Sequence, residues 1–176
     1  MKALQGIRTG LNAVLKIFII VLFAAMVIIG TYQIVARYFF NRPSTVTEEL
    51  LTYSFAWLSL FSAAYVFGKR DHMRMGFLAD KIKGRKRLVL ELLIELVILI
   101  FAAVIMVAGG ISIVKLTMGQ MTASLGIPRG YVYMALPLSG VCIVIYNAIN
   151  ILEMLITQSA DLSSYFDTTV KKEADL

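Results

Sequence analysis

Four long runs without a charged residue divide this chain of 176 residues. The shortest has nineteen residues. A helix rises about 1.5 Å per residue, so each run can cross a hydrocarbon core of roughly 30 Å. Apolar residues make up 59 % of the chain, more than a chain of this length buries in water. The sequence therefore predicts an all-α integral membrane protein. We expect one membrane domain over residues 1–176, with four transmembrane helices at approximately 14–37, 48–68, 89–116 and 131–156.

The second and third runs are separated by a basic segment, Lys69–Arg87, which holds eight of the seventeen Lys and Arg residues. Within it, residues 77–83 place Leu78 and Ile82 on one side and lysines on the other. This pattern predicts a partly amphipathic segment lying in the membrane interface between helices 2 and 3. Membrane lipids with anionic headgroups are the expected partners of its basic groups.

Basic residues also orient the spans, because they stay on the cytoplasmic side. The N-terminal segment, the basic segment and the residues after 156 hold three, eight and two basic residues, whereas the two turns on the other side hold four. We therefore expect both termini in the cytoplasm. Residues 157–176 form a polar tail that we expect to fray.

The first turn on the other side comprises residues 37–49. Pro43 ends the preceding helix, because the residue before a proline is pushed out of the α region. Thr45 or Thr47 is predicted to cap the next helix. Acidic residues favour the first turn of a helix, and this one begins with Glu48 and Glu49.

Two stripes at helical spacing run along the second span. The aromatic stripe consists of Tyr53, Trp57, Phe61 and Tyr65. The small-residue face consists of Ala56, Ser59 and Ala63, and small residues four apart permit close approach of another helix. Each stripe fits packing within the subunit or against lipid, and each fits docking to a partner membrane protein. The sequence leaves both open.

Several function classes are excluded by what the sequence lacks. The net charge of +6 sits between the spans without a nucleic-acid motif, so nucleic acid is not an expected partner. There is no phosphate-binding loop, no zinc spacing and no Ser/His/Asp set. His72 is the only histidine and Cys142 the only cysteine. We predict that the chain is not an enzyme and binds no cofactor or metal.

A self-sufficient carrier, such as a four-helix multidrug antiporter, needs an ionisable group near the middle of the bilayer. Here the acidic residues lie near span ends or outside the spans. Glu91 and Glu95 share one face near the start of the third helix, where we expect them to pair with neighbouring basic residues. This distribution favours a helper protein over an independent carrier.

The turns and the second span also carry residues in an order that resembles one family, over about residues 11–153. The acidic pair that opens the second span and the Leu-Gly-Ile-Pro turn before the last span are the most telling features. The full series is Arg37 to Leu50, Trp57, Ala63-Ala64, Asp71-His72, Gly119-Gln120, Ser124 to Pro128, Tyr133 and Pro137. Together they resemble the small, Q-type membrane subunit of TRAP transporters.

This resemblance implies a set of partners in the bacterial inner membrane. A large multi-spanning subunit would carry the substrate and sodium, so sodium is expected there and not on this chain. A periplasmic binding protein would deliver an organic acid such as sialic acid or a C4-dicarboxylate. The small subunit would act as an accessory scaffold that braces the large one.

The resemblance also places candidate contact residues for these partners. On the periplasmic side they are Arg37, Arg42, Glu48, Glu49, Gln120, Gly126, Pro128 and Arg129. Within the membrane they are Trp57, Ser59 and Ala63. The same charges equally fit helix capping and interface anchoring. The alternative function is a stand-alone four-helix membrane carrier or a self-associating membrane protein.

Overall fold

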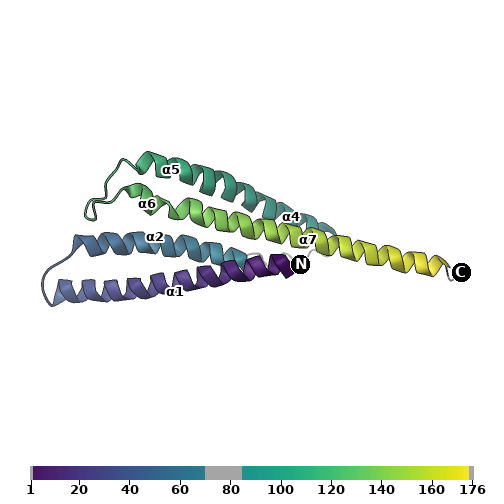
Figure 1. The fold of residues 1–176 in the computed structure, drawn as a ribbon, viewed down its shortest axis with the longest axis horizontal. Coiled ribbons are helices and arrows are strands. Elements are labelled where there is room, and N and C mark those ends of the chain that lie inside the picture. The colour runs from purple at the N-terminus through teal and green to yellow at the C-terminus, as the bar shows by residue number, and fades with distance from the viewer. Residues whose placement is uncertain (1, 70–84, 175–176) are drawn as a thin grey trace.

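The computed structural model describes residues 2–69 and 85–174, and these fold into helices joined by short turns (Figure 1). The described part contains no β-strand beyond one isolated bridge between Met121 and Pro128. The segments are α1 (Lys2–Tyr38), α2 (Thr45–Gly68), α4 (Arg85–Ile100), the π-helix η2 (Phe101–Gly109), α5 (Gly110–Thr117), α6 (Arg129–Tyr133) and α7 (Ala135–Ala174).

Four helical stretches are long and apolar enough to cross a membrane, which confirms the predicted all-helical, four-span class. They are Gln5–Tyr38, Thr45–Gly68, Leu92–Thr117 and Arg129–Met154. The interfacial segment predicted at residues 77–83 lies outside the described residues. We call the end of the molecule that carries residues 39–44 and 118–128 the turn end; Gly68 and the start of α1 mark the opposite end.

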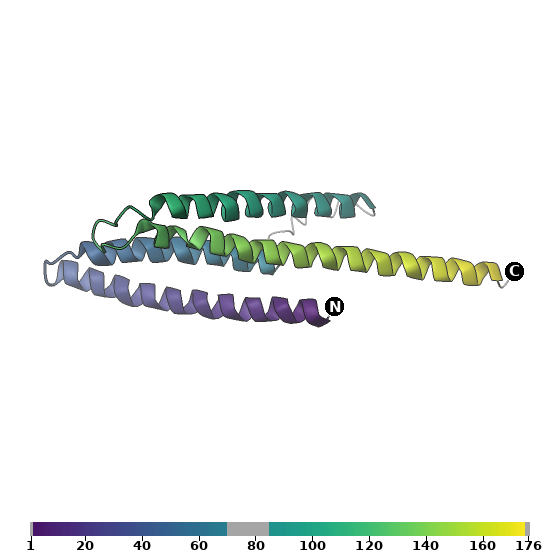
Figure 2. The same cartoon turned by 45° about the horizontal axis from the view of Figure 1, so that its top comes forward.

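The helices form two hairpins that lie side by side in a layer (Figures 1 and 2). Packing between neighbours gives the order α1, α2, α7 and then η2 with α4 and α5. The fourth span is central, since 39 % of its most apolar stretch is buried against 6–11 % for the other three. The layer therefore has α1 and the third span at its two edges.

The aromatic stripe of α2 packs inside the subunit, against α1. Phe18 of α1 meets the Phe61 ring edge-on with centroids 4.9 Å apart, and Trp57 lies 5.8 Å from Phe61. Phe61 joins Leu15, Ala135 and Tyr146 in one buried cluster. A second cluster joins three helices through Ala64, Ala102 and Ile143.

The third span is not the uninterrupted α-helix predicted for residues 89–116, because residues 101–109 are π-helical. Here the span lies very close to α7. A Cβ added to Gly110 would lie 2.9 Å from Cδ of Pro137, and one added to Gly140 would lie 2.7 Å from Cβ of Met106. The backbone here therefore shows both a change of helix type and a close crossing.

The other boundaries also differ from the prediction in ways that have physical reasons. The fourth span is divided at Met134 into α6 and α7, just before Pro137, which has no N–H to donate. The cap of α2 is Ser44, whose hydroxyl accepts from the N–H of Thr47 at 3.5 Å, and not Thr45 or Thr47. Helix α7 continues to Ala174, past the other helices, where a frayed tail was expected (Figure 2).

The glycine contacts predict a specific loss of stability. Gly140→Ala should lower the free energy of unfolding by about 1–3 kcal/mol, because Met106 and Val107 must move to admit the methyl group. Gly10→Ala is the matched control, since nothing lies within 4 Å of its Cβ position and alanine favours a helix. Thermal unfolding in detergent measures both; equal midpoints would contradict the close crossing.

Candidate partner interface

Glu49, near the start of α2, joins this helix to the second turn at the turn end. Its Oε2 accepts hydrogen bonds from the backbone N–H groups of Ser124 at 2.7 Å and Leu125 at 2.9 Å. Its Oε1 accepts from the hydroxyl of Tyr53 at 2.5 Å. Charge-assisted bonds to a carboxylate are roughly twice as strong as neutral ones. The carboxylate therefore fastens the second turn to the start of α2.

The second turn is shaped to present those N–H groups. Gly126 has φ +64°, a left-handed conformation that glycine adopts without strain. The turn closes through the N–H of Thr122, which donates to the carbonyl of Ile127 at 2.8 Å. In return, the N–H of Ile127 donates to the Thr122 hydroxyl at 3.1 Å. The sequence placed Gly126 in the Leu-Gly-Ile-Pro turn but gave no sign that Glu49 binds this turn.

Trp57 supplies a second tie between α2 and the fourth span. Its Nε1–H donates to the carbonyl of Val132 at 3.0 Å, next to the break between α6 and α7. The indole ring is half-buried against Phe18 and Phe61. The structure thus places most of this candidate contact inside the subunit.

The remaining charged candidates lie exposed at the turn end. Arg37 and Glu48 form an ion pair at 3.8 Å with both side chains more than half exposed, so it contributes little stability. Arg42, Gln120 and Arg129 are also exposed. The N–H of Arg129 donates to the carbonyl of Gln120 at 2.8 Å, which fixes the start of α6 beside the second turn. The half-buried Pro128 precedes it.

The small-residue face of α2 points away from the subunit's own packing. Ala56 and Ser59 are exposed and Ala63 is half-buried, whereas Phe61 and Ala64 of the same helix are buried. A face without large side chains permits close approach of another helix. At this face, the exposed Ala56 and Ser59 leave room for a helix of a partner.

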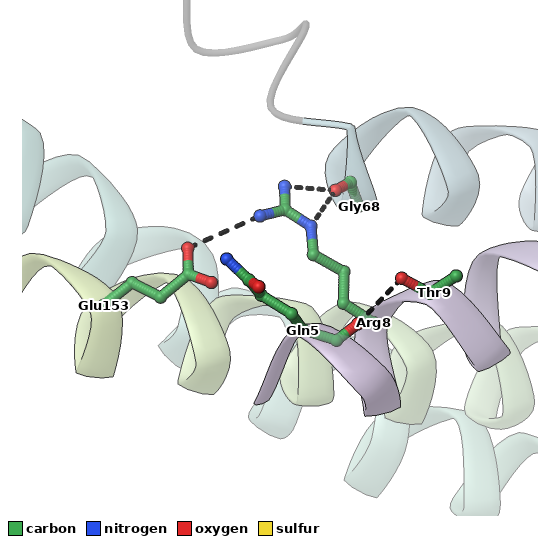
Figure 3. Close-up of polar contacts among 5 residues, drawn as sticks. All are labelled: Gln5, Arg8, Thr9, Gly68 and Glu153. Carbon is green, nitrogen blue, oxygen red and sulfur yellow. Dashed lines mark hydrogen bonds and ion pairs between the residues drawn. The ribbon is translucent and has the colours of Figure 1, made fainter. Parts of the chain in front are cut away.

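At the opposite end, Arg8 of α1 joins three helices (Figure 3). Its Nε donates to the carbonyl of Gly68 at 2.8 Å, and its other nitrogens reach the same carbonyl and the carboxylate of Glu153. The Gly68 carbonyl belongs to the last turn of α2, where carbonyls lack helical donors. In the sequence, Arg8 was recognised only as one of the basic residues that orient the spans in the membrane.

Other polar groups near this end also connect neighbouring helices. The hydroxyl of Tyr146 in α7 donates to Oδ1 of Asn12 in α1 at 2.6 Å. With its amide nitrogen toward α4, Asn147 donates to the carboxylate of Glu95 and accepts from the N–H of Leu99 at 3.1 Å. The prediction for Glu95 named only basic residues, but this fully buried carboxylate packs against an asparagine of α7.

Comparison with known proteins identifies the family to which this chain belongs. The model of the Tripartite ATP-independent periplasmic transporters, DctQ component, matches residues 26–157. The chain belongs to the DctQ family. The small permease protein SiaQ of a sialic acid TRAP transporter of Vibrio cholerae is 28 % identical over 163 residues, which cover 91 % of this chain and 94 % of that protein. A protein of Haemophilus influenzae described as a TRAP transporter small permease is 27 % identical over 133 residues, covering 76 % and 82 %.

Membership in the DctQ family confirms the predicted resemblance. The chain is a small membrane subunit of a TRAP transporter and not an enzyme. With four membrane-spanning helices, it is a multi-pass protein of the inner membrane. Its family implies a large membrane subunit and a binding protein as partners.

The Glu49 bonds predict a local loosening of the turn end. In Glu49→Gln, an amide nitrogen replaces one acceptor and the charge is lost, so the amides of Ser124 and Leu125 should exchange with deuterium about tenfold faster. Glu48→Gln is the control, because Glu48 is exposed and bonded only weakly to Arg37. Equal exchange at residues 124–127 in both variants would show that Glu49 does not hold the turn.

The Arg8 contacts predict a loss of global stability. Arg8→Leu leaves the Gly68 carbonyl and the Glu153 carboxylate without their shared donor, which should cost about 1–3 kcal/mol. Lys16→Leu, at an exposed position on the same helix, should cost less than half of that. Unfolding midpoints in detergent compare the two, and a larger effect of Lys16→Leu would refute the assignment.

Proposed function

We propose that this DctQ-family chain is the scaffold of a sodium-coupled importer that takes up an organic acid from a periplasmic binding protein. In this role it braces a large multi-spanning subunit that holds the substrate and sodium sites. Sialic acid is the first substrate to test, because the relative SiaQ is described as part of a sialic acid transporter. A C4-dicarboxylate is the second.

The observation that carries the proposal is the layer itself. A layer leaves large apolar side chains of α1 and the third span facing outward, for example Phe23, Ile28, Val97 and Phe101, each more than half exposed. Polar contacts tie the hairpins together at both ends, through Glu49 at one end and Arg8 at the other. Because the helices of the layer are already ordered, the chain loses little conformational entropy when a partner binds it.

Orientation completes the proposal. The distribution of basic residues favours an orientation in which the end opposite the turn end lies on the cytoplasmic side. Both termini would then be in the cytoplasm, and the turn end would face the periplasm. The binding protein would then meet the exposed Arg37, Arg42, Glu48 and Gln120. The large subunit would meet the membrane faces, with the small-residue face of α2 as the first candidate.

Co-purification tests the scaffold role directly. The tagged chain, extracted from native membranes in mild detergent, should bring a polytopic membrane protein in a one-to-one ratio, identified by mass spectrometry. A chain that comes out alone or only with itself in several detergents would support the stand-alone carrier instead.

A pair of variants tests which face meets the large subunit. Ser59→Phe puts a ring on the small-residue face and should lower the co-purified partner about tenfold, since overpacking at a contact costs roughly 1–3 kcal/mol. Ala24→Phe is the control, an equally exposed small residue on α1. Loss of the partner in Ala24→Phe but not in Ser59→Phe would move the contact to α1.

A further inference from the structure

A cleft lies at the turn end, beside the Ala56 end of the small-residue face. It has a volume of about 340 Å³ and is lined by Thr52, Tyr53, Ala56, Arg129, Val132 and Tyr133. This volume falls in the range of roughly 300–1,000 Å³ that is typical of small-molecule sites. The cleft lies between α2 and α6, on the side of α2 that carries Ala56.

The lining of the cleft includes a positive charge without a carboxylate partner. Arg129 is exposed, and within the described residues its guanidinium makes no ion pair or hydrogen bond. Its backbone N–H, bonded to Gln120, holds the residue at the first position of α6. Glu49 does not line the cleft, and its carboxylate is bonded to Ser124, Leu125 and Tyr53.

Like a lipid, the lining of the cleft has a polar part and an apolar part. Tyr133, another lining residue, is 44 % exposed, and tyrosine rings favour the headgroup level of a bilayer. A second, uncharged part of the lining consists of the small or apolar side chains Thr52, Ala56 and Val132, which belong to the apolar spans. Hydrocarbon fits there, because no charged side chain lines this part.

We infer that the cleft binds one phospholipid of the leaflet at the turn end. The guanidinium of Arg129 donates two parallel hydrogen bonds to the lipid phosphate. This is the bidentate geometry that arginine prefers. An acyl chain lies along Ala56 and Val132. The inference does not depend on the scaffold role, because all residues that line the cleft belong to this chain.

Native mass spectrometry of the full-length chain, purified and delipidated in detergent, tests this directly. Phosphatidylglycerol is added in steps to the natural chain and to Arg129→Gln. We expect binding to weaken about tenfold in Arg129→Gln, which loses a charged donor to the phosphate. Lys115→Gln removes an exposed charge at the same end, outside the cleft, and should bind the lipid normally.

A second variant separates the site from a general effect of charge. Ala56→Leu keeps Arg129 but fills the apolar part of the cleft, so it should also weaken lipid binding, with an unchanged unfolding midpoint. Equal lipid binding by Arg129→Gln and the natural chain would overturn the inference. So would diacylglycerol binding as tightly as phosphatidylglycerol, because diacylglycerol lacks the phosphate.

Two further outcomes identify other occupants. Displacement of the lipid by inorganic phosphate would make the cleft an anion site and overturn the lipid assignment. Retained lipid with loss of the co-purified large subunit in Arg129→Gln would make Arg129 a protein contact, which also overturns it. Failure of co-purification in the natural chain bears on the scaffold proposal alone.

Discussion

Inside a bilayer, apolar side chains gain little by turning away from lipid, so helices associate through close packing and hydrogen bonds. The hydrogen bonds that join helices in this chain are concentrated toward the two ends of the layer. Glu49 binds the second turn at one end, and Arg8 binds α2 and α7 at the other. Between them, α7 approaches η2 at Gly140, where a side chain would collide with Met106. These few contacts determine how the two hairpins lie together.

The placement of these contacts explains why a layer is stable without closing into a bundle. Hydrogen bonds at both ends prevent the hairpins from splaying, while the small buried clusters around Phe61 and Ala64 fill the middle. A closed bundle would cover the apolar faces of α1 and the third span. Here lipid or a partner subunit covers them, which is the property that a membrane scaffold requires.

The sequence predicted the number and type of the spans because length and the absence of charge are sufficient for that inference. It identified the second turn through Gly126 and Pro128, whose backbone preferences are local. It could not show that Glu49 binds the N–H groups of residues 124 and 125, because that contact joins positions 75 and 76 residues apart. From the sequence alone, a glutamate near the predicted start of a helix already has a sufficient local explanation.

The same limit applies to the aromatic stripe and to the π-helix. Periodicity places Trp57 and Phe61 on one face of α2, but periodicity does not say which neighbour that face meets, and the structure turns it toward α1. The sequence predicted one regular helix for the third span and not the π-helix at residues 101–109. Its form depends on the approach of Pro137 and Gly140 from α7, which no local pattern in the third span contains.

The internal use of Glu49 also determines what the turn end presents to partners. Because its carboxylate is bonded to the chain itself, and Glu48 faces Arg37, the basic groups of Arg42 and Arg129 are left without an acidic partner among the described residues. Their depths differ. Arg42 lies in the turn before α2, where a soluble protein can reach it, whereas Arg129 borders a cleft between apolar spans. The two cations therefore fit different partners: Arg42 an acidic protein surface, and Arg129 the phosphate of a lipid.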